Sequence, residues 1–252
     1  MRKIVVYLGI IVFVLTLVGK QSDAQTVNGA FKRNDIFQKK PMPLPTVREA
    51  DVFWSKKVWR VIDLREKMNQ TLYYPTLPIE GRENLISLLL SGIETGQITP
   101  FDASFDDDFK VPMSFAQVKE SFGAEATMIE KIDFDTGERT MVPVEGDIKS
   151  RSNEIKQYMV KEEWYFDKQT STLNVRILGI CPIREYTREG DTNGEVQRQK
   201  LFWVYYPEVR PLLATNLVLN QYNEARQMSF DDLFIKRFFN SYIVQESNVY
   251  NN

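Results

Sequence analysis

The sequence contains no histidine and a single cysteine, and both shortages limit the chemistry that this protein could perform. Without histidine, a Ser-His-Asp or Cys-His nucleophile and a histidine-ligated zinc site are excluded. One cysteine, Cys181, excludes a disulfide within the chain, so stability must come from packing. The sequence also lacks a Walker loop, a dinucleotide-binding glycine fingerprint and an EF-hand loop. Only carboxylate, lysine, tyrosine or Ser-Lys chemistry remains open, and we predict no catalytic residues, no metal site and no cofactor.

The sequence also has no large excess of positive or negative charge. It contains 32 basic and 34 acidic residues, and its formal net charge is -2. A chain without a basic excess carries no electrostatic footprint for nucleic acid, so no nucleic-acid partner is expected. Apolar residues make up 43% of the chain and aromatic residues 12%, which is enough for a substantial core. The composition predicts a folded protein.

The first 24 residues have the pattern of a secretory signal peptide. Arg2 and Lys3 give a basic start, residues 4–18 are an apolar run, and small residues precede a cut after Ala24. The run is shorter than the roughly 18–20 residues of a spanning helix, which makes the alternative of a membrane anchor weaker. No cysteine follows the run, so no lipid is expected on the mature N-terminus. We predict an exported protein.

Residues 25–46 form a basic arm in which prolines 41, 43 and 45 alternate with other residues. Alternating prolines exclude helix and favour a stiff, extended backbone. Two interpretations remain open: a disordered leader, or a segment that lies across a neighbouring subunit. Under the second interpretation, the predicted partner contacts in this arm are Arg33, Phe37, Lys39, Lys40 and Leu44.

Residues 49–69 are predicted to form a helix, because their apolar side chains cluster on one broad face at 100° per residue. Trp59 projects to the opposite, charged side of that helix. It could be buried in its own domain between two layers, or it could be a subunit contact, since tryptophan is enriched in interface cores.

The remaining pattern predicts an α+β fold: N-terminal helices followed by an antiparallel β-meander with a C-terminal helix packed on it. The domain covers residues 47–252 and could consist of two halves, 47–125 and 126–252. Helices are expected at 82–95, 114–122 and 229–239, and strands at 98–105, 128–134, 139–144, 157–166, 172–183, 200–206 and 242–245. Pro182 and Pro207 are expected to mark strand ends.

Two reactive-looking features have ordinary structural explanations. Cys181 should share one strand face with Leu173, Val175, Ile177 and Gly179, which is typical of a small buried hydrophobe rather than a nucleophile. The run 106–108, three aspartates, lacks the alternating ligands and the glycine of a calcium loop, so we interpret it as a solvated turn.

Several aromatic-rich stretches resemble one known family. They are residues 51–67 (DVFWSKKVWRVIDLREK), 73–75 (YYP), 81–90 (GRENLISLLL), 180–182 (ICP), 201–208 (LFWVYYPE), 230–232 (FDD), 242–243 (YI) and 246–248 (ESN). This set is similar to the GldN/PorN family of gliding-motility proteins of the Bacteroidetes, over about residues 47–250.

The resemblance implies a non-enzymatic, ring-forming subunit of the type IX secretion system, located in the periplasm and associated with the outer membrane. The implied partners are copies of the chain itself, an outer-membrane lipoprotein of the PorK/GldK type, and the periplasmic part of a PorM/GldM-type motor component. The family supplies no catalytic residues to carry over.

Two other functions stay open. An exported glycoside hydrolase needs only two carboxylates across a cleft, and Asp102 with Asp106, or Glu162 with Glu163, could be nominated. A free periplasmic binding protein or chaperone would instead be a monomer with a large exposed cleft.

Overall fold

The computed structural model describes residues 39–79, 81–104, 107–123, 127–132, 139–144, 150–187, 195–219 and 227–248, which all belong to one unit, residues 36–252. The predicted signal peptide and the arm up to residue 38, with Arg33 and Phe37, lie outside the described residues, and so does Asp106.

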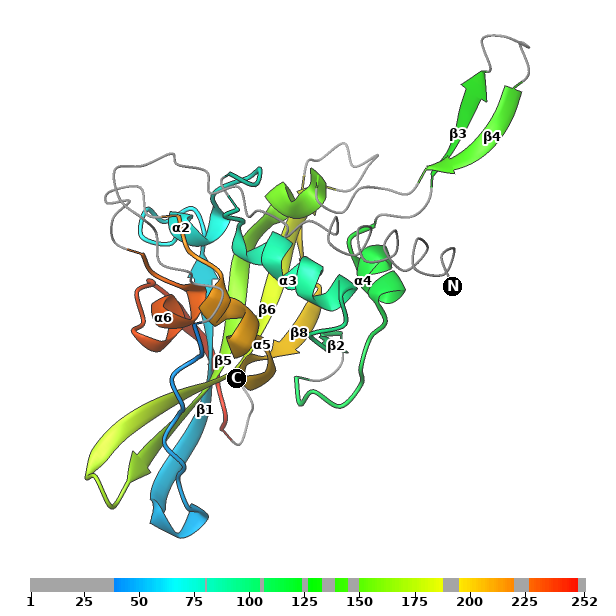
Figure 1. Ribbon diagram of the computed structural model, residues 1–252. Coiled ribbons are helices and arrows are strands. Elements are labelled where there is room, and N and C mark those ends of the chain that lie inside the picture. The colour runs from blue at the N-terminus through cyan, green and yellow to red at the C-terminus, as the bar shows by residue number, and fades with distance from the viewer. Residues whose placement is uncertain are drawn as a thin grey trace, which may run out of the picture. The chain divides into compact units, whose positions relative to one another are not determined.

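Within the described residues, seven antiparallel strands form one sheet in the order β2-β8-β6-β5-β1-β9, and β7 pairs with the far end of β6 (Figure 1). Two further strands, β3 and β4, form a hairpin of their own. The strands are β1 (Val52–Asp63), β2 (Pro100–Asp102), β3 (Thr127–Ile132), β4 (Arg139–Val144), β5 (Ile155–Asp167), β6 (Thr172–Thr187), β7 (Val196–Lys200), β8 (Phe202–Tyr205) and β9 (Tyr242–Glu246).

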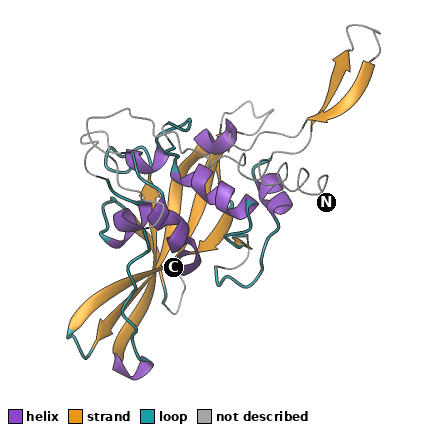
Figure 2. Cartoon of the chain, in the orientation of Figure 1, coloured by secondary structure: helices purple, strands orange, loops and turns teal. Residues whose placement is uncertain are grey.

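Helices cover one face of this sheet, as Figure 2 shows. The larger core contains buried side chains from α3, α5 and α6. It also contains the strand residues that face these helices, among them Ile62, Tyr158 and Phe202. The α+β prediction, with a C-terminal helix packed on an antiparallel sheet, is confirmed. The helices are η2 (Glu49–Asp51), α2 (Gln70–Tyr73), α3 (Leu85–Glu94), α4 (Phe115–Ser121), η3 (Ser150–Glu154), α5 (Tyr206–Thr215) and α6 (Phe230–Ile235).

Local signals in the sequence predicted three of these helices correctly. Asn84, Ser114 and Ser229 each accept a hydrogen bond from a main-chain N–H in the first turn, and Ser114 completes a capping box with Gln117. Such a cap stabilises a helix by about 1 kcal/mol. Gly96 ends α3 with φ +71°, a conformation that glycine adopts without strain. Helix α6 ends at Ile235, four residues earlier than predicted.

The helix predicted over residues 49–69 is wrong. Residues 52–63 form strand β1, which pairs with β5 along its whole length and with β9 near its end. Valine, tryptophan and isoleucine make up half of this segment, and such residues favour a pleated surface. Its two faces enter two different cores: Ile62 packs under the helices, whereas Trp59 and Val61 pack on the opposite side.

Two expectations for the following strands are also corrected. A bulge opposite Lys161 and Glu162 inserts Leu178 into β6, so Ile177 and Cys181 point to opposite faces rather than sharing one. Pro182 does not end β6, because the strand continues to Thr187. Pro207 does follow a strand, but it opens helix α5, which the sequence analysis missed.

Candidate interaction site

The candidate site is a pocket on the sheet face that carries no helices. Its volume is about 420 Å³, and its walls come from β1, β5, β7, β8, the segment after β2 and the end of β9. Beneath it lies a second, smaller core, built on Trp59, Met159, Cys181 and Trp203. The lining residues are Lys57, Trp59, Ala103, Ser104, Asp107, Asp108, Lys161, Lys200, Trp203, Gln245 and Ser247.

Lys161 is a buried charge in the lining of this pocket, with 2% of its side chain exposed. Its Nζ donates to the main-chain oxygen of Asp107 at 2.8 Å and to Asp108 Oδ1 at 3.3 Å. The same ammonium lies 5.5 Å from the ring centroids of Trp59 and Phe109. A buried ammonium is costly unless it is paired, so these contacts hold the segment after β2 against the sheet.

The two aspartates are occupied by neighbouring donors. Trp59 Nε1 donates to Asp107 Oδ2. Asp108 accepts from Lys110 and Lys161, and these hydrogen bonds hold the pKa of its carboxyl below the ordinary value. The solvated turn predicted here is thus more structured than expected, because two of its three aspartates fix a loop on the sheet.

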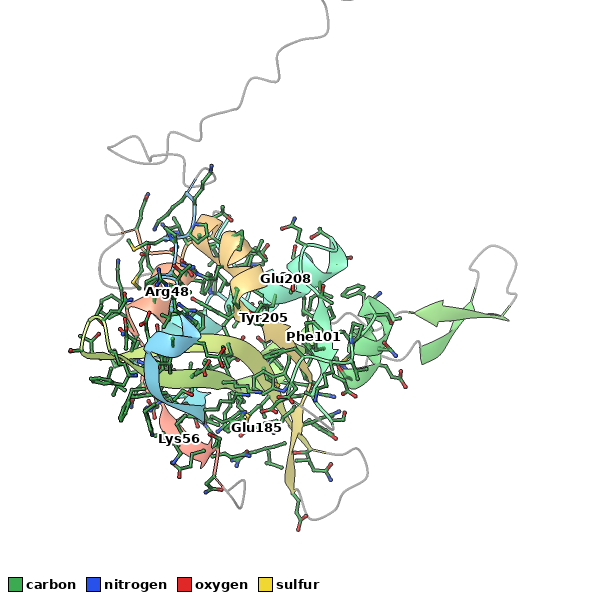
Figure 3. The ribbon with its side chains drawn as sticks, turned by 90° about the horizontal axis from the view of Figure 1, so that it is seen from below. Arg48, Lys56, Phe101, Glu185, Tyr205 and Glu208 are labelled. Carbon is green, nitrogen blue, oxygen red and sulfur yellow. The ribbon has the colours of Figure 1, made fainter. Side chains whose placement is uncertain are left out.

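Phe109 packs against the second core, next to the loop that carries the two aspartates. Its backbone has φ +56°, and its ring makes edge contacts with Phe101, Trp203 and Tyr205 at centroid distances of 5.8, 6.0 and 5.5 Å (Phe101 and Tyr205 are labelled in Figure 3). Gly179 makes room for it, since a Cβ there would lie 2.5 Å from Phe109 Cζ.

The described part of the predicted arm, residues 39–46, contacts its own domain. Lys39 forms an ion pair with Asp232 at the start of α6. Arg210 donates to the main-chain oxygen of Met42 at 2.6 Å, and Arg176 donates to that of Pro45 at 2.6 Å. Two of these three contacts use main-chain oxygens, which every residue type provides. Lys40 is exposed and Leu44 is partly exposed.

A buried ion pair lies beneath this arm. Arg210 and Asp231 each expose 8% of their side chains, and Arg210 Nε lies 2.9 Å from Asp231 Oδ1. Tyr206 also donates to Asp231 at 3.0 Å. Burial, reinforced by the Asp231 charge, raises the pKa of the Tyr206 hydroxyl, so it stays protonated and acts as a donor.

Trp59, the other residue predicted to contact a partner, is 5% exposed and packs within its own domain. This position favours the first of its two interpretations, burial between two layers, although the segment is a strand. What surface it retains lies in the lining of the pocket.

The nominated acidic pairs do not form a shared cleft among the described residues. Glu162 is fully buried and accepts from Arg237 at 2.7 Å and from Trp164 at 3.0 Å. Glu163 is its neighbour in β5 and pairs in register with Arg176. Asp102 accepts from the main-chain N–H of Ser104, and its nominated partner Asp106 is outside the described residues. Burial raises the pKa of the Cys181 thiol to about 12, so it is unsuited to nucleophilic chemistry.

Sequence reasoning missed the pocket because its lining comes from segments far apart in the chain. One signal was available: Lys161 directly follows the apolar residues 158–160 of β5, where an unpaired lysine would be unfavourable if buried. Within the described residues, no three metal-ligating side chains lie close together, and no helix is long and apolar enough to cross a membrane.

Fold and site together define an α+β protein with a polar pocket on one face of an antiparallel sheet. A family model described as gliding motility associated protein GldN matches residues 47–252, so the chain belongs to the GldN family. Membership confirms the resemblance and implies a component of the gliding-motility and type IX secretion machinery. No curated protein matches the sequence.

Proposed function

We propose that this protein is a non-enzymatic structural subunit of the type IX secretion and gliding machinery, which forms a ring in the periplasm. The proposed partners are copies of itself, an outer-membrane lipoprotein of the PorK/GldK type and a PorM/GldM-type motor component. The observation that carries the proposal is the family match over residues 47–252. The predicted signal peptide, cut after Ala24, supplies the route to the periplasm.

Several buried charged side chains are paired within the chain, and this pairing supports a structural role rather than catalysis. Glu162, Lys161, Asp231 and Arg210 are buried, and each is bound by a partner within the chain. A catalytic acid or base instead needs access to a substrate and a pKa suited to proton transfer. A ring subunit acts through its shape and stiffness. Many modest interfaces between such subunits close a symmetric assembly that transmits force.

The arm is proposed to contribute to these interfaces through Arg33, Phe37, Lys39, Lys40 and Leu44. The main-chain oxygens of Met42 and Pro45 are bound by arginines of the domain. These contacts do not depend on the side chains of the arm. The corresponding arginines of a neighbouring subunit could therefore bind the arm in the same way. Trp59 is proposed to act through the pocket that it lines.

Electron microscopy of the mature chain, co-purified with the lipoprotein partner, tests the proposal. Closed rings containing both proteins are the expected result. Two results together would support the carboxylate enzyme instead. The chain would never join a larger assembly, and it would hydrolyse a glycan with an activity that is lost when one acidic side chain is neutralised.

A further inference from the structure

The described residues that line the pocket carry more positive than negative charge. Three lysines, Lys57, Lys161 and Lys200, face two aspartates. Both aspartates are already bound, by Lys161, Lys110 and Trp59. Lys57 and Lys200 are exposed at the rim, and neither forms an ion pair within the described part of the chain. Among the residues that the structure describes, these two ammonium groups of the pocket therefore have no ion-pair partner.

A neutral donor in the same lining also suits a carboxylate. Ser104 supplies a hydroxyl group there. A carboxylate accepts charge-assisted hydrogen bonds from ammonium groups and further bonds from such neutral donors. The aspartates in the lining would repel a doubly charged phosphate more strongly than a singly charged carboxylate.

The strand beside the pocket suits an extended polypeptide. β9 lies at the end of the sheet and pairs with β1 on one side, and its Gln245 lines the pocket. Tyr242, Ile243 and Val244 expose 48, 55 and 45% of their surface, which is unusual for an edge strand that stays unpaired. An edge of this kind can pair with a strand of another chain.

From these observations we propose that the pocket binds an acidic side chain carried by an extended segment of a partner protein, which pairs its main chain with β9. The volume, about 420 Å³, lies within the range of binding pockets and admits one or two side chains. A protein segment fits better than a free small acid, because the polar lining offers little apolar surface and the exposed β9 residues add the missing contact. The proposal rests on the proposed function insofar as the occupant belongs to a partner in an assembly.

The test uses the mature chain and a fluorescein-labelled hexapeptide of alternating valine and glutamate, measured by fluorescence anisotropy. The pocket variant is Lys57→Gln with Lys200→Gln. The matched control is Lys67→Gln with Lys168→Gln, two exposed lysines that do not line the pocket. All proteins are first checked for an unchanged melting temperature. We expect the pocket variant to bind the peptide at least tenfold more weakly, and the control to stay within twofold of the wild type.

Three results would overturn the proposal. The first is equal binding by both variants. The second is equal binding of a valine–glutamine peptide, which would assign capture to β9 alone. The third is glutarate binding as tightly as the peptide, which would indicate a small-molecule site. Sedimentation of the same variants with the lipoprotein distinguishes failure of this proposal from failure of the proposed function. Ring-sized complexes of a chain that does not bind the peptide would reject the pocket proposal alone. A wild-type chain that never assembles would reject the proposed function.

Discussion

Trp59 and Lys161 lie directly opposite each other on neighbouring strands, and both bind Asp107. The lysine ammonium is 5.5 Å from the indole centroid, so a cation–π contact, an indole hydrogen bond and an ion pair meet at one point. This relationship joins the loop after β2 to the centre of the sheet. It makes a residue that sequence reasoning nominated for partner contact part of the domain's own second core.

Replacing Trp59 tests that assignment. The Trp59→Ala variant should lose about 3–5 kcal/mol of unfolding free energy, because a buried indole is removed and Asp107 loses a donor. The matched control is Trp54→Ala on the same strand, 46% exposed, which should cost less than about 1 kcal/mol. Urea denaturation measures both. A Trp59→Ala variant of normal stability that fails to assemble would instead identify a subunit contact.

Gly179 and Phe109 should be energetically coupled. A methyl group at Gly179 would lie 2.5 Å from Phe109 Cζ and 3.0 Å from the main-chain oxygen of Val204. Gly179→Ala should therefore destabilise the fold by about 1–3 kcal/mol through overpacking. Phe109→Ala removes the side chain in contact, so the double variant should be more stable than the sum of the two single changes predicts. Strict additivity in this double-mutant cycle would show that the two residues do not contact each other.

Arg210 should be essential for the stability of α5, α6 and the arm. The Arg210→Ala variant leaves Asp231 buried with one donor, Tyr206, and removes the donor to Met42. Breaking a buried pair on one side costs about 3–5 kcal/mol. Arg198→Ala, whose ion pair with Glu185 is largely exposed on the arginine side, serves as the control and should cost less than about 1 kcal/mol. Thermal unfolding followed by circular dichroism compares them, and similar losses would refute the assigned role.

Asp63 should contribute a pH-dependent part of the stability. The side-chain hydrogen bond from Arg65 lowers the pKa of Asp63 to about 2, against about 3.9 in an unfolded chain. Because the folded pKa is the lower one, this stabilisation is complete above about pH 4 and is lost as the pH falls toward 2. Arg65 is largely exposed, so solvent screening limits the effect to below about 1 kcal/mol.

The Asp63→Asn variant removes the stabilisation that comes from the ionised Asp63 carboxylate. Its unfolding free energy should be lower than that of the wild type at pH 5, and the two values should converge near pH 2. Urea denaturation at both pH values provides the comparison. A difference that persists unchanged at pH 2 would mean that the carboxylate charge is not the cause.

Sequence patterns predicted those elements whose signals are local. Three helices followed from apolar periodicity and from end signals such as Gly96 and Ser229, and the two central hairpins followed from alternation and turn residues. Strand β1 was mistaken for a helix because its apolar positions satisfy both periods, and its pairing partner β5 lies about a hundred residues away. Tertiary pairing decides such cases.

The candidate site could not be predicted as a whole, since no local pattern brings β1, β5, β7 and β9 together. The insertion of Leu178, which turns Cys181 to the second core, likewise depends on the register between β5 and β6. The arm residues were nominated from composition, and composition does not specify which subunit an arm contacts.

Sedimentation velocity of the mature chain, alone and with the lipoprotein partner, tests the central claim most directly. The account predicts a discrete complex of many subunits when both proteins are present, with no substrate turnover in the same sample. A chain that sediments as a monomer at every concentration, with or without the lipoprotein, would contradict it.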